Sequence, residues 1–187
     1  MKARPKTLLD KPRGGAWPSS ARGVNCPVKS GKIGELKMRK MVFDENMAYL
    51  LGMYYGRGTE KGIGIKTKSK DLQSSFLNHA LKMGISPEKI TVTEDSIFFF
   101  HSRLKVRFEK MIKERLAVFK RMNTKTLAFI AGLTAVCGKI KEKSIIFSGI
   151  NETDALLFER LGFRTTWRKG KLIILDASEI IEPISLI

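Results

Sequence analysis

Cationic side chains are the most abundant groups in this 187-residue sequence that could bind a ligand. Lysine and arginine number 35 against 18 aspartates and glutamates, which gives a formal net charge of +17. A charge of this size favours a polyanionic partner, most often nucleic acid, because ammonium and guanidinium groups pair with phosphates. We favour that interpretation over a basic protein without such a partner.

The cysteines and histidines do not form a metal-binding pattern. Cys26 and Cys137 stand far apart, and His79 and His101 are equally isolated. Structural zinc sites need closely spaced ligand pairs, so we expect no metal and no cofactor. Two scattered cysteines fit a reducing cytoplasm. No apolar run approaches the roughly 20 residues of a membrane span, and we expect no membrane partner.

The segment 1–42 differs in composition from the rest of the chain. Its first forty residues hold eleven lysines and arginines, two acids, four prolines and five glycines. Such a segment cannot bury enough apolar surface to fold alone. It is either a solvated leader or an extended basic arm that binds structured RNA through phosphates, with a tryptophan to stack on a base. We favour the arm, and its predicted contacts are Lys2, Arg4, Lys6, Lys11, Arg13, Trp17, Arg22, Lys29 and Lys32.

Two apolar stretches rich in small residues repeat one pattern, LLGMYYGRG at 50–58 and IAGLTAVCG at 130–138. Each has glycine at its third place and ends in glycine. Small residues at helical spacing let two helix backbones approach closely, and a glycine suits a helix end. We therefore predict helices over 44–56, capped by Asp44, and over 124–137.

The same order of elements follows each of these helices: a strand, a helix and a hairpin. Asp71 and Asn151 both stand thirteen residues after the glycine that ends the stretch, and both suit a helix N-cap. A repeat of this length indicates internal duplication. The predicted elements are strand 62–68, helix 71–83, strands 89–94 and 96–102, and a basic amphipathic helix 103–120, then strand 139–147, a helix from Asn151 and hairpin 164–176.

With both copies in place, residues 43–187 resemble a single-chain LAGLIDADG homing endonuclease. The resemblance implies an α+β fold of two pseudo-symmetric αββαββα halves, residues 43–122 and 123–187, preceded by the basic tail. It also implies that the glycine-containing helices pack together at the centre. Two four-stranded sheets would form a basic saddle that holds duplex nucleic acid.

The sequence differs from this family at the motif positions that bind the catalytic metal in the family. The eighth motif position, an acid that holds divalent metal in the family, is Arg57 in the first copy and Cys137 in the second. Metal-dependent phosphodiester hydrolysis needs anionic oxygen ligands, which an arginine and a thiol do not supply. Neither Glu60 nor Glu142 is a clear replacement, since one lies beyond the glycine and the other within a predicted strand. We expect a protein that is not an enzyme.

By the same resemblance, outward positions on the predicted strands would lie on the saddle. Trp167 falls among cations there and could add a stacking surface. These predicted RNA contacts are Lys66, Lys68, Lys139, Lys141, Lys143, Arg164, Trp167, Arg168 and Lys169.

The predicted function is non-catalytic binding of structured RNA on a repurposed LAGLIDADG scaffold. The most concrete form is a cytoplasmic ribosomal or ribosome-associated protein that binds ribosomal RNA, touches neighbouring ribosomal proteins, and is a monomer outside that complex. An intron maturase or a site-specific DNA-binding protein is the alternative on the same scaffold. An active endonuclease with displaced ligands is less favoured, and the charge argues against a protein with no nucleic-acid partner.

Overall fold

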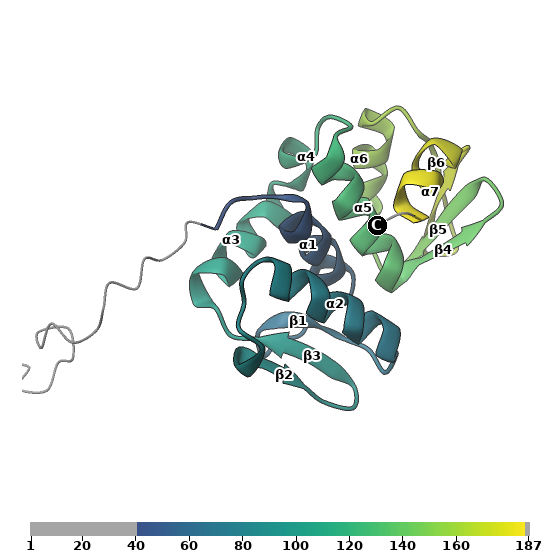
Figure 1. The fold of residues 1–187 in the computed structure, drawn as a ribbon. Helices are drawn as coiled ribbons and strands as arrows, with labels where there is room; N and C mark the ends of the chain where they lie inside the picture. Colours follow the sequence, from purple (N-terminus) through teal and green to yellow (C-terminus); the bar gives the residue numbers. More distant parts are fainter. Residues whose placement is uncertain (1–40, 186–187) are drawn as a thin grey trace, which may run out of the picture. The chain divides into compact units, whose positions relative to one another are not determined.

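The computed structural model describes the backbone of residues 41–185 and the side chains of residues 41–182. Two helices lie side by side at its centre, α1 (Glu45–Arg57) and α5 (Thr124–Cys137) (Figure 1). Each begins at a polar cap, because Asp44 accepts a hydrogen bond from the Met47 amide and Asn123 accepts one from the Thr126 amide. The predicted cap at Asp44 is confirmed.

The contact between α1 and α5 is backbone against backbone. A Cβ at Gly52 would overlap the Phe129 carbonyl oxygen, and a Cβ at Gly132 would overlap the Tyr49 carbonyl oxygen. Glycine at both crossing positions is therefore required by the approach of the two helices. The predicted close-packing face of each helix is confirmed.

The first half carries a three-stranded antiparallel sheet in the order β1-β3-β2. Helix α2 packs on one face of it, where the rings of Phe76 and Phe99 lie 6.1 Å apart. The elements of this half after α1 are β1 (Ile63–Lys66), α2 (Lys70–Lys82), η4 (Pro87–Lys89), β2 (Ile90–Val92) and β3 (Ser96–Phe99).

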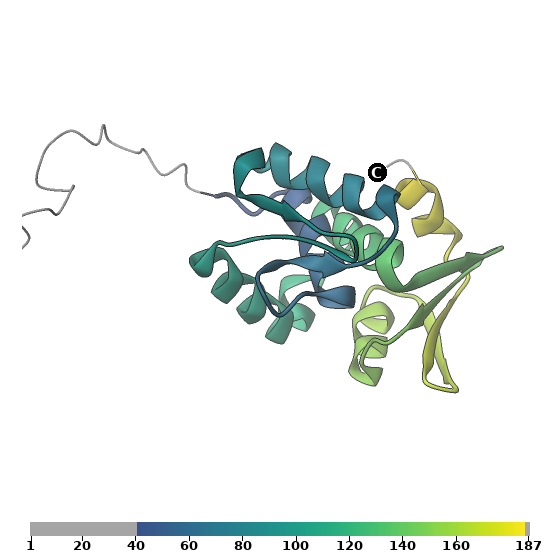
Figure 2. The same ribbon diagram turned by 90° about the horizontal axis from the view of Figure 1, so that it is seen from below.

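The second half carries a four-stranded antiparallel sheet in the order β4-β5-β7-β6. Figure 2 shows this sheet on the far side of α5 from the first sheet. The elements of this half after α5 are β4 (Gly138–Lys141), β5 (Ser144–Ser148), η5 (Glu152–Asp154), α6 (Ala155–Arg160), β6 (Arg164–Arg168), β7 (Lys171–Leu175) and α7 (Ser178–Ser185).

The predicted fourth strand of the first sheet is wrong, since a single bridge between Gly58 and Ile65 stands in its place. The corresponding pairing in the second half joins Gly138 to Phe147 across a longer segment. The cap of α2 is Ser69 rather than the predicted Asp71, whereas Asn151 does cap η5. The segment from Gly138 to the Asn151 cap is therefore two residues longer than the segment from Gly58 to the Ser69 cap.

Those two residues give the second half a complete hairpin where the sequence predicted one strand, 139–147. The turn falls at Glu142, whose φ of 49° reverses the chain, and Lys141 pairs with Ser144 across it. In the first half the shorter segment closes on itself instead, and the Thr59 amide donates to the Gly64 carbonyl.

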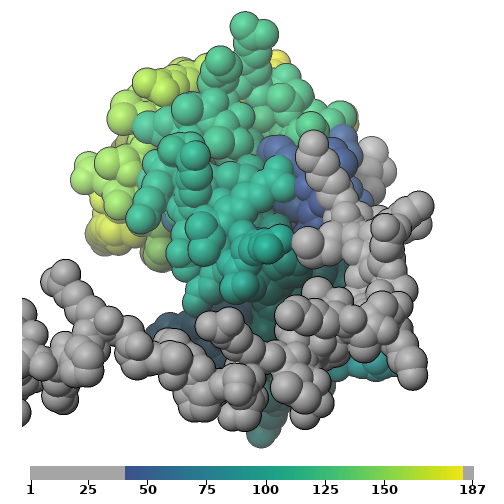
Figure 3. Space-filling model, turned by 90° about the vertical axis from the view of Figure 1, so that its left-hand side faces the viewer, coloured from purple at the N-terminus to yellow at the C-terminus, as the bar shows by residue number. Residues whose placement is uncertain are grey.

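The predicted helix 103–120 is two helices, α3 (Ser102–Lys113) and α4 (Arg115–Val118), separated at Glu114. Figure 3 shows this connection, in teal and green, between the start of α1 and the yellow-green second half. Its apolar side chains pack inward, with Leu104 and Phe108 buried and Phe119 stacked on Phe129 at 4.2 Å.

Candidate nucleic-acid interface

The outer face of the second sheet, turned away from α5 and α6, is a cationic surface. Period-two alternation sends Ile145 and Phe147 inward to the core and Ile146 and Ser148 outward. The register places Lys139 beside Ile146, and Ile146 beside Ile173. One surface thus runs across all four strands.

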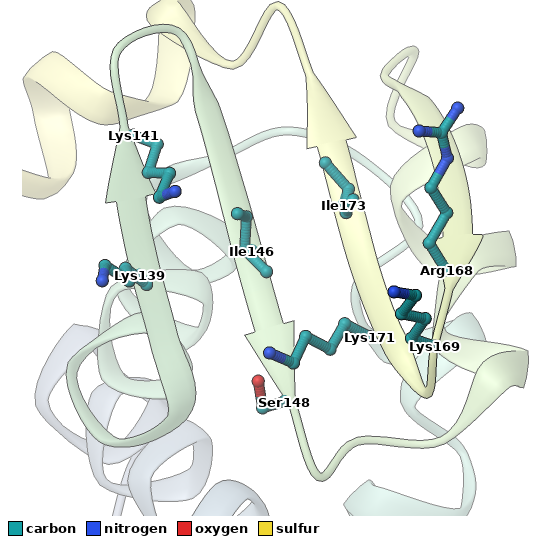
Figure 4. Close-up of a pocket in the computed structure, with 8 residues that line it drawn as sticks. All are labelled: Lys139, Lys141, Ile146, Ser148, Arg168, Lys169, Lys171 and Ile173. Carbon is teal, nitrogen blue, oxygen red and sulfur yellow. The ribbon is translucent and has the colours of Figure 1, made fainter.

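This outer face is hollowed, with a volume of about 560 Å³. Figure 4 shows lysine and arginine side chains around a floor made by Ile146 and Ile173. We call this surface the cationic face, and its lining residues are Lys139, Lys141, Ile146, Ser148, Arg168, Lys169, Lys171 and Ile173.

The five cations of the cationic face are exposed to solvent. Among the described residues, none that lines the hollow is a carboxylate, and no ion pair joins any of the five to an acid. Clustered positive charge without local compensation raises the potential over a surface and attracts polyanions. The arrangement suits phosphate groups.

Four of the predicted contacts meet on the cationic face: Lys139, Lys141, Arg168 and Lys169. Lys171 joins them and was missed, although it faces Arg168 across the β6–β7 hairpin. The hairpin register was the available signal, because residues directly opposite in an antiparallel pair share one face.

Other predicted saddle residues lie elsewhere. Trp167 is half-buried and packs against the core opposite Leu172, so the prediction that it points outward is wrong. Successive side chains of a strand point to opposite faces of the sheet, so Trp167 points inward because its neighbour Arg168 points outward. Lys143 lies in the β4–β5 turn, and Arg164 lies at the far end of β6 in an ion pair with Asp176.

Two predicted contacts, Lys66 and Lys68, lie in the first half, exposed at and just beyond the end of β1. Nine more lie outside the described residues: Lys2, Arg4, Lys6, Lys11, Arg13, Trp17, Arg22, Lys29 and Lys32.

The adjoining ends of α1 and α5 bring together the two positions that would hold metal in the family. A Cβ at Gly56 would lie 3.1 Å from Cys137 Sγ. Burial raises the pKa of the Cys137 thiol to about 12, despite the opposing effect of Arg57, and Sγ donates to the Leu133 carbonyl at 3.1 Å. A neutral thiol and an exposed guanidinium do not fit Mg²⁺ or Mn²⁺. Within residues 41–182, no cluster of three or more acidic, histidine or cysteine side chains could hold a metal ion.

A buried polar network beside these helix ends joins both halves. Asp154, 1% exposed, accepts from Arg115 Nε at 2.5 Å, from the Tyr55 hydroxyl at 2.6 Å and from the Asn151 amide at 3.0 Å. Burial and the bond to Asp154 raise the pKa of the Tyr55 hydroxyl, which therefore stays protonated. With its oxygens satisfied in this way, Asp154 is a structural anchor rather than a metal ligand.

Comparison with solved structures supports the fold. The homing endonuclease I-DmoI in complex with DNA and Mn is 22% identical, with a TM-score of 0.53 over 77% of this chain and 96% of that one. Mesophilic variants of I-DmoI are 20% identical, with a TM-score of 0.54 over 76% and 96%. The complex of I-DmoI with DNA and Ca is 20% identical, with a TM-score of 0.53 over 76% and 90%.

No protein-family model matches the sequence, and neither does any curated protein sequence. The structural likeness shows that residues 41–185 have the α+β fold of LAGLIDADG homing endonucleases. Among the described helices, none is long and apolar enough to cross a membrane.

Proposed function

We propose that this chain is a non-catalytic nucleic-acid-binding protein that holds a duplex on the cationic face of its second half. The observation that carries the proposal is the set of five cations on one open sheet face, Lys139, Lys141, Arg168, Lys169 and Lys171, around an apolar floor. Phosphate contacts of this kind supply most of the affinity in non-specific binding and position the ligand in specific binding.

The spacing of the cations suits a duplex. Lys139 and Lys141 lie on one edge strand and Arg168 on the other. Neighbouring strands are about 4.8 Å apart, so the two edges of a four-stranded sheet are separated by about 14 Å. The major groove of B-form DNA is about 12 Å wide. Cations at the two edges can therefore reach phosphates on both sides of one groove.

The residues at the helix ends support binding without cleavage. Arg57 and Cys137 stand where the resemblance places metal-binding acids, and neither supplies an anionic oxygen. A guanidinium at this position favours a phosphate and disfavours a divalent cation. We therefore assign no hydrolytic role to this chain.

Duplex DNA is the first ligand we propose, because the similar solved structures include complexes with DNA. A site-specific DNA-binding protein or an intron maturase fits this form of the proposal. Structured RNA is the second candidate, favoured by the +9 charge of residues 1–40. In that form the chain is a ribosomal or ribosome-associated protein that binds ribosomal RNA in the cytoplasm beside other ribosomal proteins.

The test measures binding of the full chain to a blunt DNA duplex and to an RNA hairpin with the same stem sequence. Fluorescence anisotropy over a salt series gives both affinity and salt slope. Each phosphate contact on B-form DNA contributes about 0.9 to the slope. We expect the double variant Lys139→Glu, Lys171→Glu to lower the slope by about 1.8 and to weaken binding to both ligands.

A matched control reverses two exposed lysines on other surfaces, Lys82→Glu and Lys89→Glu, with the same change in net charge. Equal losses in the two double variants would show attraction to overall charge and would overturn the site. Incubation of the duplex with magnesium should leave it intact. Cleavage by the wild type that is lost in Glu60→Gln or Glu142→Gln would overturn the non-catalytic assignment.

A further inference from the structure

The outer face of the first sheet carries an exposed aromatic ring in place of a row of cations. Phe100 directly follows β3 and is 67% exposed. Phe99 points to the core, so the alternation turns Phe98 and Phe100 to the opposite face. Phe98 is buried there, and its ring meets the Phe100 ring edge-on with centroids 5.4 Å apart. Phe98 therefore holds Phe100 in place while leaving it accessible.

The chain beside these rings has glycine at Gly62 and Gly64. Gly64 pairs with Phe98, and a Cβ at Gly64 would overlap the Phe98 side chain. A Cβ at Gly62 would lie 2.6 Å from the Phe99 carbonyl oxygen. Because glycine is required at both places, neither Gly62, just before β1, nor Gly64, within it, carries a side chain that could cover Phe100. A flat ligand can approach the ring from this side.

Positive charge gathers at the border of the same surface. Lys105 Nζ donates to the Glu60 carbonyl oxygen at 3.1 Å, and Lys66 Nζ lies 3.6 Å from Glu60 Oε1. Lys61 is exposed in the same loop, which ends at Gly62. One ammonium group faces the Glu60 carboxylate, a second bonds the Glu60 carbonyl, and a third lies on the next residue, Lys61, so the loop that leads to Gly62 carries net positive charge. Positive charge together with an exposed aromatic ring is typical of surfaces that bind single-stranded nucleic acid.

We propose that Phe100 stacks on an unpaired base of the nucleic acid that this chain binds, with the lysines near Glu60 facing the adjoining phosphates. This inference rests on the proposed function and narrows its ligand to a duplex that continues into a single-stranded segment. The cationic face of the second half holds the paired region, and the first half holds the unpaired nucleotide. Every base has an aromatic face, so the contact tolerates different sequences.

The test compares a blunt DNA duplex with the same duplex carrying a short single-stranded extension. Removing a base-stacking aromatic side chain weakens binding by roughly 5- to 150-fold. We expect Phe100→Ala to show such a loss on the extended duplex and no change on the blunt one. Phe100→Trp should restore binding, because tryptophan offers a larger stacking surface. Val92→Ala, at another exposed apolar residue of this sheet (53% exposed), is the matched control and should leave both affinities unchanged.

Each outcome decides for or against the inference. Equal affinities of Phe100→Ala and wild type for the extended duplex would overturn it, as would a loss of the same size on both ligands. Sedimentation of the free protein provides a separate readout: a wild-type dimer that dissociates in Phe100→Ala would overturn it by assigning the ring to self-association. Phe100-dependent binding of the extended duplex, with no binding of the blunt one, would support the inference while the proposed duplex site failed.

Discussion

The two sheets of this molecule have the same internal construction and opposite outer chemistry. The second sheet has four strands and carries the five exposed cations of the cationic face. The first has three strands, with glycines at Gly62 and Gly64 and an exposed phenylalanine directly after β3. Their inward faces agree, since Ile63 and Ile65 are as fully buried as Ile145 and Phe147. Burial constrains the inward face of a duplicated sheet, while its outward face remains free to diverge.

The segment between α5 and the next cap is two residues longer than the corresponding segment after α1, and the difference between the two sheets begins there. The longer segment completes the β4–β5 hairpin and places Lys139 and Lys141 on an edge strand. The shorter one leaves a single bridge at Gly58. A small difference in length therefore decides whether a half presents a row of cations. Experiments that weaken one half at a time can test how independent the two halves are.

The largest expected effect belongs to Asp154, whose network has no counterpart among the corresponding residues of the first half. Removing one partner of a buried ion pair costs about 3–5 kcal/mol, because the other charge stays buried without compensation. We expect Asp154→Ala to lower the free energy of unfolding by that amount in urea titrations. Asp176→Ala, which removes the acid of an exposed pair, is the control and should change it by less than about 1 kcal/mol. Similar losses in the two variants would contradict the anchoring role of Asp154.

The glycines at the crossing of α1 and α5 should give the next largest effect, and the same effect in each half. A methyl group at Gly52 or Gly132 must push two helix backbones apart, which costs about 3 kcal/mol by overpacking. Gly84→Ala, where no atom lies within 4 Å but φ is +83°, should cost about 1 kcal/mol. Thermal unfolding measures all three. A clear difference in stability between Gly52→Ala and Gly132→Ala would show that the two glycines contribute unequally to the interface despite their similar geometry.

His79 should make the first half sensitive to acid. Burial lowers the pKa of this imidazole to about 4, from an ordinary value near 6.5, and its ring stacks on Tyr49 at 4.0 Å. The unfolded state binds the proton more tightly, so the stabilisation is complete above pH 6.5 and is lost as the pH falls toward 4. The loss amounts to roughly 2–3 kcal/mol. Urea titrations at pH 7 and at pH 4 should show it in the wild type, and the decline should be smaller in His79→Gln. Equal losses of stability between pH 7 and pH 4 in the wild type and in His79→Gln would assign the acid sensitivity to other groups.

The smallest expected effect compares single cations on the two sheets. Lys171→Ala removes one proposed phosphate contact and should lower the salt slope for duplex DNA by about 0.9. Lys66→Ala should change this slope by less, because Lys66 already faces Glu60. Anisotropy titrations of the blunt duplex measure both variants. Equal changes would show that the two sheets share the duplex.

Much of the fold could be predicted from local patterns. The small residues of 50–58 and 130–138 indicated a close helix pair, and Asp44 and Asn151 marked true caps. Asp71 misled because it suits a cap as well as Ser69 does. With Asp71 taken as the cap, the segments after the two central helices have equal lengths, so the sequence did not indicate that the first segment is shorter.

The candidate site was less predictable, because a sheet face depends on pairing between distant strands. Lys139 and Lys171 are neighbours through β5 and β7, which no local pattern reveals. Trp167 was misplaced by a single position of alternation, which reverses the direction of a side chain. Three consecutive phenylalanines, Phe98 to Phe100, do not show by themselves that β3 ends at Phe99 and that the Phe100 ring is exposed.

The glycine crossing of α1 and α5 also has a consequence for biosynthesis. The partner of α1 lies in the other half of the chain, so α1 emerges during translation well before α5 is available. Until then its glycine-bearing apolar face is uncovered, and the α5 helix of another copy presents the surface that fits it. The interval between the two helices is thus the period in which this protein is most exposed to misassembly between copies.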